Sequence, residues 1–139
     1  MTARYLLDTN VLSEPMRPRP NRRVMERLQR HEGVVATASV VWHELLYGAC
    51  RLPDSDKRRA IDKYLSEVVG ATIPILPYDG MAAAWHASER ARLAVAGRTP
   101  PFVDGQIAAI ARVNGLVLVT NNLEDYKGFD GVDLEKWHR

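Results

Sequence analysis

Short apolar runs alternate with helix-like segments along the chain, and this alternation limits the possible folds more than any other feature. The strand-like runs are residues 5–7, 34–36, 73–76, 116–119 and 132–134. Strands that alternate with helices predict a parallel sheet covered by helices on both faces. In such a sheet, ligands bind beyond the carboxyl ends of the strands. The polar residues that follow each run are therefore the first place to look for a site.

Capping residues indicate where the helices begin and end. Asn21, Ser39, Asp54 and Asp79 each precede a helix-like segment and can accept a hydrogen bond from its first N–H groups. Glycines stand at the expected ends of three helices. The expected helices are a basic one up to residue 30, then 40–50, 55–69, 80–97 and about 103–114.

Length and composition indicate one ordinary globular domain. The chain has 139 residues, of which 46% are hydrophobic and 26% charged, so we expect a single domain over residues 1–139. No apolar run approaches the ~20 residues of a membrane helix, and the apolar stretch near residue 5 is too short for a secretory signal. Cys50 is the single cysteine, which excludes an internal disulfide. We expect a cytoplasmic protein without a membrane partner.

Basic residues are concentrated in two parts of the chain. Six arginines lie between residues 15 and 30 against one acid, Glu26, although the net charge of the chain is only +2. A second group lies between residues 51 and 63. Clusters of this kind suit an anionic polymer such as nucleic acid. Solvated helix faces explain them equally well.

Three acids occupy places that a solvated surface does not explain. Asp8 directly follows the first strand-like run, Glu44 lies among apolar residues of the helix expected at 40–50, and Asp104 lies on the packed face of the last expected helix. Each has an ordinary structural explanation: a helix cap for Asp8, a helix-edge position for Glu44 and a favourable helix dipole for Asp104. A polar loop, Thr120 to Asp125, follows the strongest strand.

Taken together, the three acids could converge at one edge of the sheet. Carboxylates a few ångströms apart repel one another unless a cation neutralises them. Ligation by oxygen atoms alone suits Mg²⁺ or Mn²⁺, which can bind a phosphate and orient a nucleophilic water. The histidines show no metal-ligand spacing, and Cys50 has no nearby partner in sequence other than His43. The acids therefore favour metal-dependent phosphodiester chemistry.

Four sequence blocks, in order, resemble those of a known family. They are LDTNVLSE at 7–14, ELLYG at 44–48, DGQIAAIA at 104–111 and LVTNNLEDY at 118–126. This pattern resembles the PIN-domain ribonucleases, and more closely the VapC and FitB-like toxins of bacterial toxin–antitoxin pairs. The resemblance implies an α/β fold with three layers, α/β/α, around a short, mainly parallel central sheet. It also implies a Mg²⁺-dependent endoribonuclease, with Mn²⁺ as an alternative ion.

The resemblance assigns roles to particular residues. Asp8, Glu44 and Asp104 match the metal-binding acids, with Asp8 and Asp104 as direct ligands and Glu44 bound directly or through water. Asn122 stands where the family carries Asp or Asn, and Asp125 is a candidate for the remaining charge. The expected catalytic set is Asp8, Glu44, Asp104, Asn122 and Asp125, supported by hydrogen bonds from Thr9 and Thr120. Asn121 replaces an arginine that many relatives carry.

The resemblance also implies partners. They are an RNA substrate, a cognate antitoxin protein that blocks the active-site groove, and a second copy of the chain in a homodimer. The residues expected to contact the RNA backbone are Arg17, Arg19, Arg22 and Arg23.

Two other functions fit some of these residues. Asp8 at a strand end also suits the nucleophile of an aspartyl-phosphate phosphotransferase. That chemistry normally needs a second acid two residues later, where Asn10 stands, and a lysine, the first of which is Lys57. The other alternative is a non-catalytic PIN relative that binds RNA or a partner protein. Loss of the acids would mark such a protein, and all three are present.

Overall fold

A five-stranded parallel sheet forms the centre of the protein. The computed structural model describes residues 2–139. The strands are β1 (Tyr5–Leu7), β2 (Val35–Ala38), β3 (Ile75–Leu76), β4 (Val117–Val119) and β5 (Leu134–Glu135). They lie in the order β3-β2-β1-β4-β5, and every neighbouring pair is parallel. The prediction of an α/β fold with a short parallel sheet is confirmed.

Helices and single helical turns connect the strands. The longer helices are α2 (Arg22–Arg30), α3 (Ser39–Cys50), α4 (Asp56–Tyr64), α6 (Gly80–Val95) and α7 (Phe102–Val113). The shorter elements are α1 (Thr9–Leu12), η1 (Glu14–Met16), η2 (Leu65–Val69), α5 (Gly70–Thr72) and η3 (Leu123–Asp125). Within residues 2–139, no helix is both long and apolar enough to cross a membrane.

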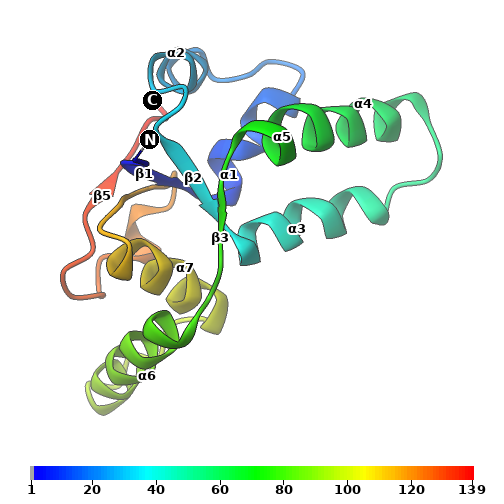
Figure 1. Cartoon of the computed structure of the whole chain (residues 1–139). Helices are drawn as coiled ribbons and strands as arrows, with labels where there is room; N and C mark the ends of the chain where they lie inside the picture. Colours follow the sequence, from blue (N-terminus) through cyan, green and yellow to red (C-terminus); the bar gives the residue numbers. More distant parts are fainter. Residues whose placement is uncertain (1) are drawn as a thin grey trace.

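The helices form a layer on each side of the sheet. The chain passes from β1 to β2 to β3 in one direction along the sheet and then returns past β1 to β4. Since parallel crossovers are right-handed, this reversal moves the connecting helices from one face to the other. Figure 1 shows α2 on one side of the strands and the packed pair α6 and α7 on the other.

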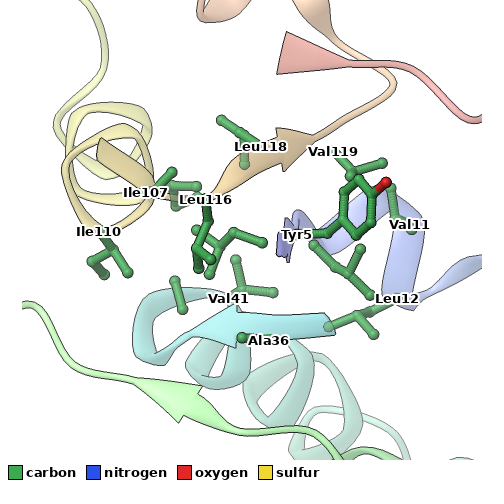
Figure 2. Close-up of a cluster of buried hydrophobic side chains, with 14 of the residues drawn as sticks. Tyr5, Val11, Leu12, Ala36, Val41, Ile107, Ile110, Leu116, Leu118 and Val119 are labelled. Carbon is green, nitrogen blue, oxygen red and sulfur yellow. The ribbon is translucent and has the colours of Figure 1, made fainter. Parts of the chain in front are cut away.

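The core lies between the sheet and these layers. All residues of β1 and β2 are buried, which explains why their sequences are apolar without alternation. Figure 2 shows Ile107 and Ile110 of α7 in the same cluster of buried side chains as Leu116, which precedes β4. Burying a side chain of this size stabilises the fold by about 1.5–3 kcal/mol. The core therefore holds α7, and with it Asp104, against the sheet.

Several boundaries differ from those expected. The strand expected at 34–36 is β2, residues 35–38, because Thr37 stays in register with Leu7 and its hydroxyl donates to the Leu7 carbonyl at 2.8 Å. The strand expected at 73–76 begins only at Ile75, since Pro74 has no N–H to donate to a neighbouring strand. The last strand starts at residue 134 and not at 132.

The helix expected at 55–69 is in fact two elements. It begins at Asp56 with Ser55, not Asp54, as its N-cap, since the Ser55 hydroxyl accepts from the Arg58 N–H at 3.1 Å. From residue 65 the helix widens into the π-helical turn η2. The helix expected to end at residue 97 ends at Val95. Caps at two other helices are confirmed, because the side chains of Asn21 and Asp79 accept from N–H groups three residues later. The cap predicted at Ser39 is wrong, because Ser39 is the first residue of α3 and Ala38 is its N-cap.

Candidate functional site

Asp8 lies at the point where the strand order reverses. β1 has β2 on one side and β4 on the other, and the chain reaches these two neighbours by crossovers in opposite directions. Asp8 directly follows β1, and Thr120 directly follows β4. The Thr120 hydroxyl donates to Asp8 Oδ2 at 2.8 Å, although the two residues are 112 apart in sequence. Such a switch point is where open α/β sheets form their binding crevice.

The Asp8 carboxylate is buried and held by three donors. Oδ1 accepts from the Thr9 N–H at 2.8 Å, which makes Asp8 the N-cap of α1, and Oδ2 accepts from Tyr126 Oη at 3.2 Å as well as from Thr120. Burial raises the pKa of Asp8, although these three hydrogen bonds oppose the shift. Capping is therefore one role of Asp8, but it employs only one of the two carboxylate oxygens.

Asp104 occupies the first turn of α7, where the negative charge of Asp8 acts on its carboxylate. Burial is the main cause that raises the pKa of Asp104 to about 6, followed by the negative charges of Asp125 and Asp8. Asp125, at the end of η3, also raises the pKa of Asp8. The structure thus brings together three carboxylates from the end of β1, the start of α7 and the loop after β4.

Glu44 is placed differently from the other predicted acids. It lies on α3 with its side chain about half exposed, and its carboxylate is 3.8 Å from His43 Nδ1. Helix α3 packs against both α1 and α7, so it borders the acidic site. The Glu44 carboxylate is not among the charges that shift the pKa of Asp8 or Asp104. Its role as a metal ligand stays a prediction.

Asn10 fixes the loop that carries Asn122. The Asn10 side chain accepts from the Asn121 N–H at 2.9 Å and donates to the Thr120 hydroxyl at 3.4 Å. The same hydroxyl accepts from the Asn122 N–H at 3.1 Å. These bonds tie the turn after β4 to α1. The side chains of Asn122 and Asp125 remain exposed at the surface of this turn.

Two side chains next to the site were not assigned roles from the sequence. Tyr126 is buried, and its hydroxyl contacts Asp8; burial and the nearby Asp8 charge raise the pKa of Tyr126. Both Tyr126 and Asn10 lie inside the sequence blocks quoted above, but nothing in their spacing indicates these contacts. Only the pairing of β1 with β4 brings them together.

His86 supports the first turn of α7. Its ring is buried on α6 and hydrogen-bonded through Nδ1 to Tyr78 Oη at 2.7 Å. A Cβ atom at Gly105 would lie 2.1 Å from His86 Nε2, so the close approach of α6 and α7 requires glycine at this position. Since Gly105 follows Asp104 in the chain, this contact sets where the Asp104 carboxylate lies. An isolated glycine inside a helix was the available signal.

The arginines expected to contact RNA lie on and just before α2. Arg17 is 3.6 Å from Glu14, and Arg22 is 3.4 Å from Glu26. Arg19 is exposed, and the Nε atom of Arg23 is buried without a hydrogen-bond partner among residues 2–139. Figure 1 shows α2 across the sheet from α7, which carries Asp104. Their contact with RNA stays a prediction.

The comparison with known families agrees with this arrangement. The model of the PIN domain family matches residues 5–130. The chain belongs to the PIN domain family. Among curated relatives, it is 33% identical to the tRNA(fMet)-specific endonuclease VapC of Shigella flexneri over 96% of this chain and 98% of that protein. It is 34% identical to the toxin FitB of Neisseria gonorrhoeae, again over 96% and 98%.

Several solved structures with the same fold are toxin–antitoxin complexes. A structure of FitAB bound to an IR36 DNA fragment matches this PIN domain with a TM-score of 0.89 and 29% identity, over 97% of this chain and 96% of the other. A DNA-bound VapBC from Salmonella typhimurium matches with a TM-score of 0.83 and 31% identity, over 97% and 98%. The prediction of a PIN-domain relative of VapC and FitB is confirmed.

The acidic residues of this PIN domain fit a hard divalent cation. Within residues 2–139, no three His, Cys, Asp or Glu side chains are arranged as a complete metal cage. Mg²⁺ does not require one, because it usually keeps several waters and binds through one or two carboxylates plus substrate phosphate. The raised pKa values of Asp8 and Asp104 indicate that the groups around them compensate only part of the cost of burying their negative charges. A bound cation would provide that compensation.

Proposed function

We propose that this PIN domain is a metal-dependent endoribonuclease that hydrolyses RNA phosphodiester bonds and acts as the toxin of a toxin–antitoxin pair. The observation that carries the proposal is the hydrogen bond between Thr120 and Asp8 at the switch point of the sheet, where the charges of Asp104 and Asp125 are also close. Relatives that match nearly the whole chain are named as an endonuclease and as a toxin, which supports the reaction and the biological role.

Asp8 and Asp104 would hold Mg²⁺, or Mn²⁺ in its place, with Glu44 binding it directly or through water. When bound, the ion lowers the pKa of a water molecule and stabilises the negative charge that develops on the phosphate. The protein's own contribution is orientation. Thr120, the Thr9 N–H and Tyr126 fix both oxygens of Asp8, so that its position costs no reorganisation during the reaction.

The turn after β4 supplies the rest of the site. The Asn122 N–H donates to Thr120, which holds the backbone at this position, and the exposed side-chain amide of Asn122 would hold a water or contact the ion. Asp125 adds a carboxylate whose charge reaches both Asp8 and Asp104. The two residues therefore complement each other, one as a neutral polar group and the other as an additional charge.

The proposed partners are RNA, a cognate antitoxin and a second copy of the chain, in the bacterial cytoplasm. The antitoxin is supported by structural relatives solved as FitAB and VapBC complexes. Arg17, Arg19, Arg22 and Arg23 would contact the RNA backbone at some distance from the cleaved bond. Contacts of this kind position a strand without reading its sequence.

The direct test is RNA cleavage by the purified chain with and without a chelator. We expect cleavage in Mg²⁺ or Mn²⁺, loss of cleavage in EDTA and recovery when the ion is restored. Asp8→Asn should abolish cleavage, whereas Asp133→Asn should not, because Asp133 is exposed and its side chain has no hydrogen bond or ion pair in the described chain. Cleavage that persists in EDTA, or in the Asp8 variant, would overturn the proposal.

A further inference from the structure

A polar cavity lies beside the acidic site, along the turn after β4. It has a volume of about 330 Å³ and is lined by residues 121–125 together with Lys127 and Lys136. Two of its lining residues, Asn122 and Asp125, belong to the proposed catalytic set. The cavity therefore shares two residues with the site where the phosphodiester bond would be cleaved. Its volume is at the lower end of the range found for small-molecule pockets.

Lys136 brings to this cavity a positive charge that forms no ion pair among residues 2–139. It directly follows β5, and the residue before it, Glu135, turns its carboxylate toward Arg27 and the Trp137 indole N–H. Lys136 lines the cavity and has no carboxylate within ion-pairing distance in residues 2–139. The other lysine of the cavity, Lys127, is paired with Glu124. Lys136 is thus available to bind a phosphate group.

Two asparagines, Asn121 and Asn122, form one part of the cavity wall. The backbone N–H groups of Asn121 and Asn122 donate to Asn10 and Thr120, so this wall is held in place. Their side-chain amides, in contrast, have no hydrogen bonds to other described residues. Each amide offers one acceptor and two donor hydrogens. Proteins read unpaired RNA bases by hydrogen bonds to the base edges, for which such amides are suited.

We propose that this cavity binds one nucleotide of single-stranded RNA adjacent to the cleaved phosphate, and this inference rests on the proposed function. Lys136 binds the backbone phosphate of that nucleotide, and the Asn121 amide contacts the edge of its base. Leu123 provides an apolar surface in the same lining. The contact with Lys136 gives affinity, and the contact with Asn121 gives a base preference next to the cleavage position.

The affinity part is tested by the salt dependence of RNA binding in EDTA, where no cleavage is expected. The probe is a short fluorescent single-stranded RNA of random sequence, measured with wild type, Lys136→Ala, Lys136→Arg and Lys63→Ala. Lys63 is an exposed lysine on α4 that does not line the cavity and is not one of the four arginines assigned to the RNA backbone, so it serves as the control for a basic residue elsewhere on the surface. Loss of one phosphate contact should reduce the slope of log Kd against log salt by about 0.7. We expect this for Lys136→Ala alone, with affinity weakened about fivefold to tenfold at low salt.

The base-reading part is tested by sequencing the cleavage products of a random RNA pool in Mg²⁺. Asn121→Ala should weaken the base preference at one position beside the cut and leave the salt slope unchanged. If wild type cleaves RNA and Lys136→Ala keeps the wild-type salt slope, the nucleotide subsite is overturned and the nuclease function stands. If wild type binds RNA with the predicted dependence on Lys136 but never cleaves it, the subsite stands and the nuclease function falls.

Discussion

Replacing Asp104 with asparagine should stabilise the metal-free protein while abolishing RNA cleavage. The substitution keeps the shape of the side chain and removes its charge. In the folded protein, burial and the charges of Asp125 and Asp8 raise the pKa of Asp104 from 3.8 to about 6. A raised carboxyl pKa means that the fold disfavours the charged form. The free-energy cost is therefore absent below the unfolded pKa, grows as the pH rises toward 6, and is complete above it.

The size of the effect follows from this shift. A difference of about 2 pKa units corresponds to about 3 kcal/mol as an upper limit. Asp104 is only partly buried, so solvent screening reduces this to about 1–2 kcal/mol. In a domain of this size, that gain corresponds to an increase in melting temperature of roughly 3–6 °C. The expected gain is small but measurable, and it has a defined pH dependence.

Melting curves of the Asp104→Asn variant and wild type, recorded in EDTA, test this reasoning. At about pH 8 the variant should melt at the higher temperature, and near pH 4 the two proteins should melt together. Asp133→Asn is the control, because Asp133 is exposed and its charge is not among those that raise the pKa of Asp104. A variant that is less stable than wild type at pH 8, or a gain that does not change with pH, would refute the role of charge crowding.

Three further substitutions test neighbouring features. Gly105→Ala should destabilise the protein by about 1–3 kcal/mol, because the new methyl group would collide with the buried His86 ring. Gly48→Ala, where the added Cβ meets no atom within 4 Å, should instead stabilise α3 by about 0.5–1 kcal/mol. Urea unfolding measures the stability of both variants. Equal effects of the two substitutions would contradict the packing argument. Tyr126→Phe removes a donor to Asp8 and should weaken Mg²⁺ binding about tenfold, as measured by calorimetry; unchanged affinity would show that this hydrogen bond does not orient Asp8.

The order of strands and helices could be predicted from the sequence, but their ends could not always be placed. Buried parallel strands produce continuous apolar runs, which is why β1 and β4 were easily located. The two-residue strand β3 is shorter than its apolar run, since Pro74 cannot donate to a ladder. The π-helical turn η2 has no composition that distinguishes it from the helix before it. Such local geometry depends on tertiary packing.

Part of the candidate site could likewise be predicted from the sequence, and part of it could not. The position of Asp8 at a strand end predicts its place at the sheet edge, and Asp104 follows from an acid on the packed face of a helix. The contacts of Asn10 and Tyr126 depend on the β1–β4 pairing, which joins residues more than a hundred positions apart. Asn10 is also relevant to the phosphotransferase alternative. That chemistry needs a second acid at position 10, and the Asn10 side chain there instead holds the turn after β4.

The most direct test of the metal site is to map where a bound ion lies along the chain. Fe²⁺ can replace Mg²⁺, and with ascorbate and peroxide it cuts the backbone close to its own position. We predict cuts near residues 8, 44, 104 and 122, all suppressed by excess Mg²⁺. Cuts confined to one of these segments, or located elsewhere in the chain, would contradict a shared ion between β1, α3, α7 and the turn after β4.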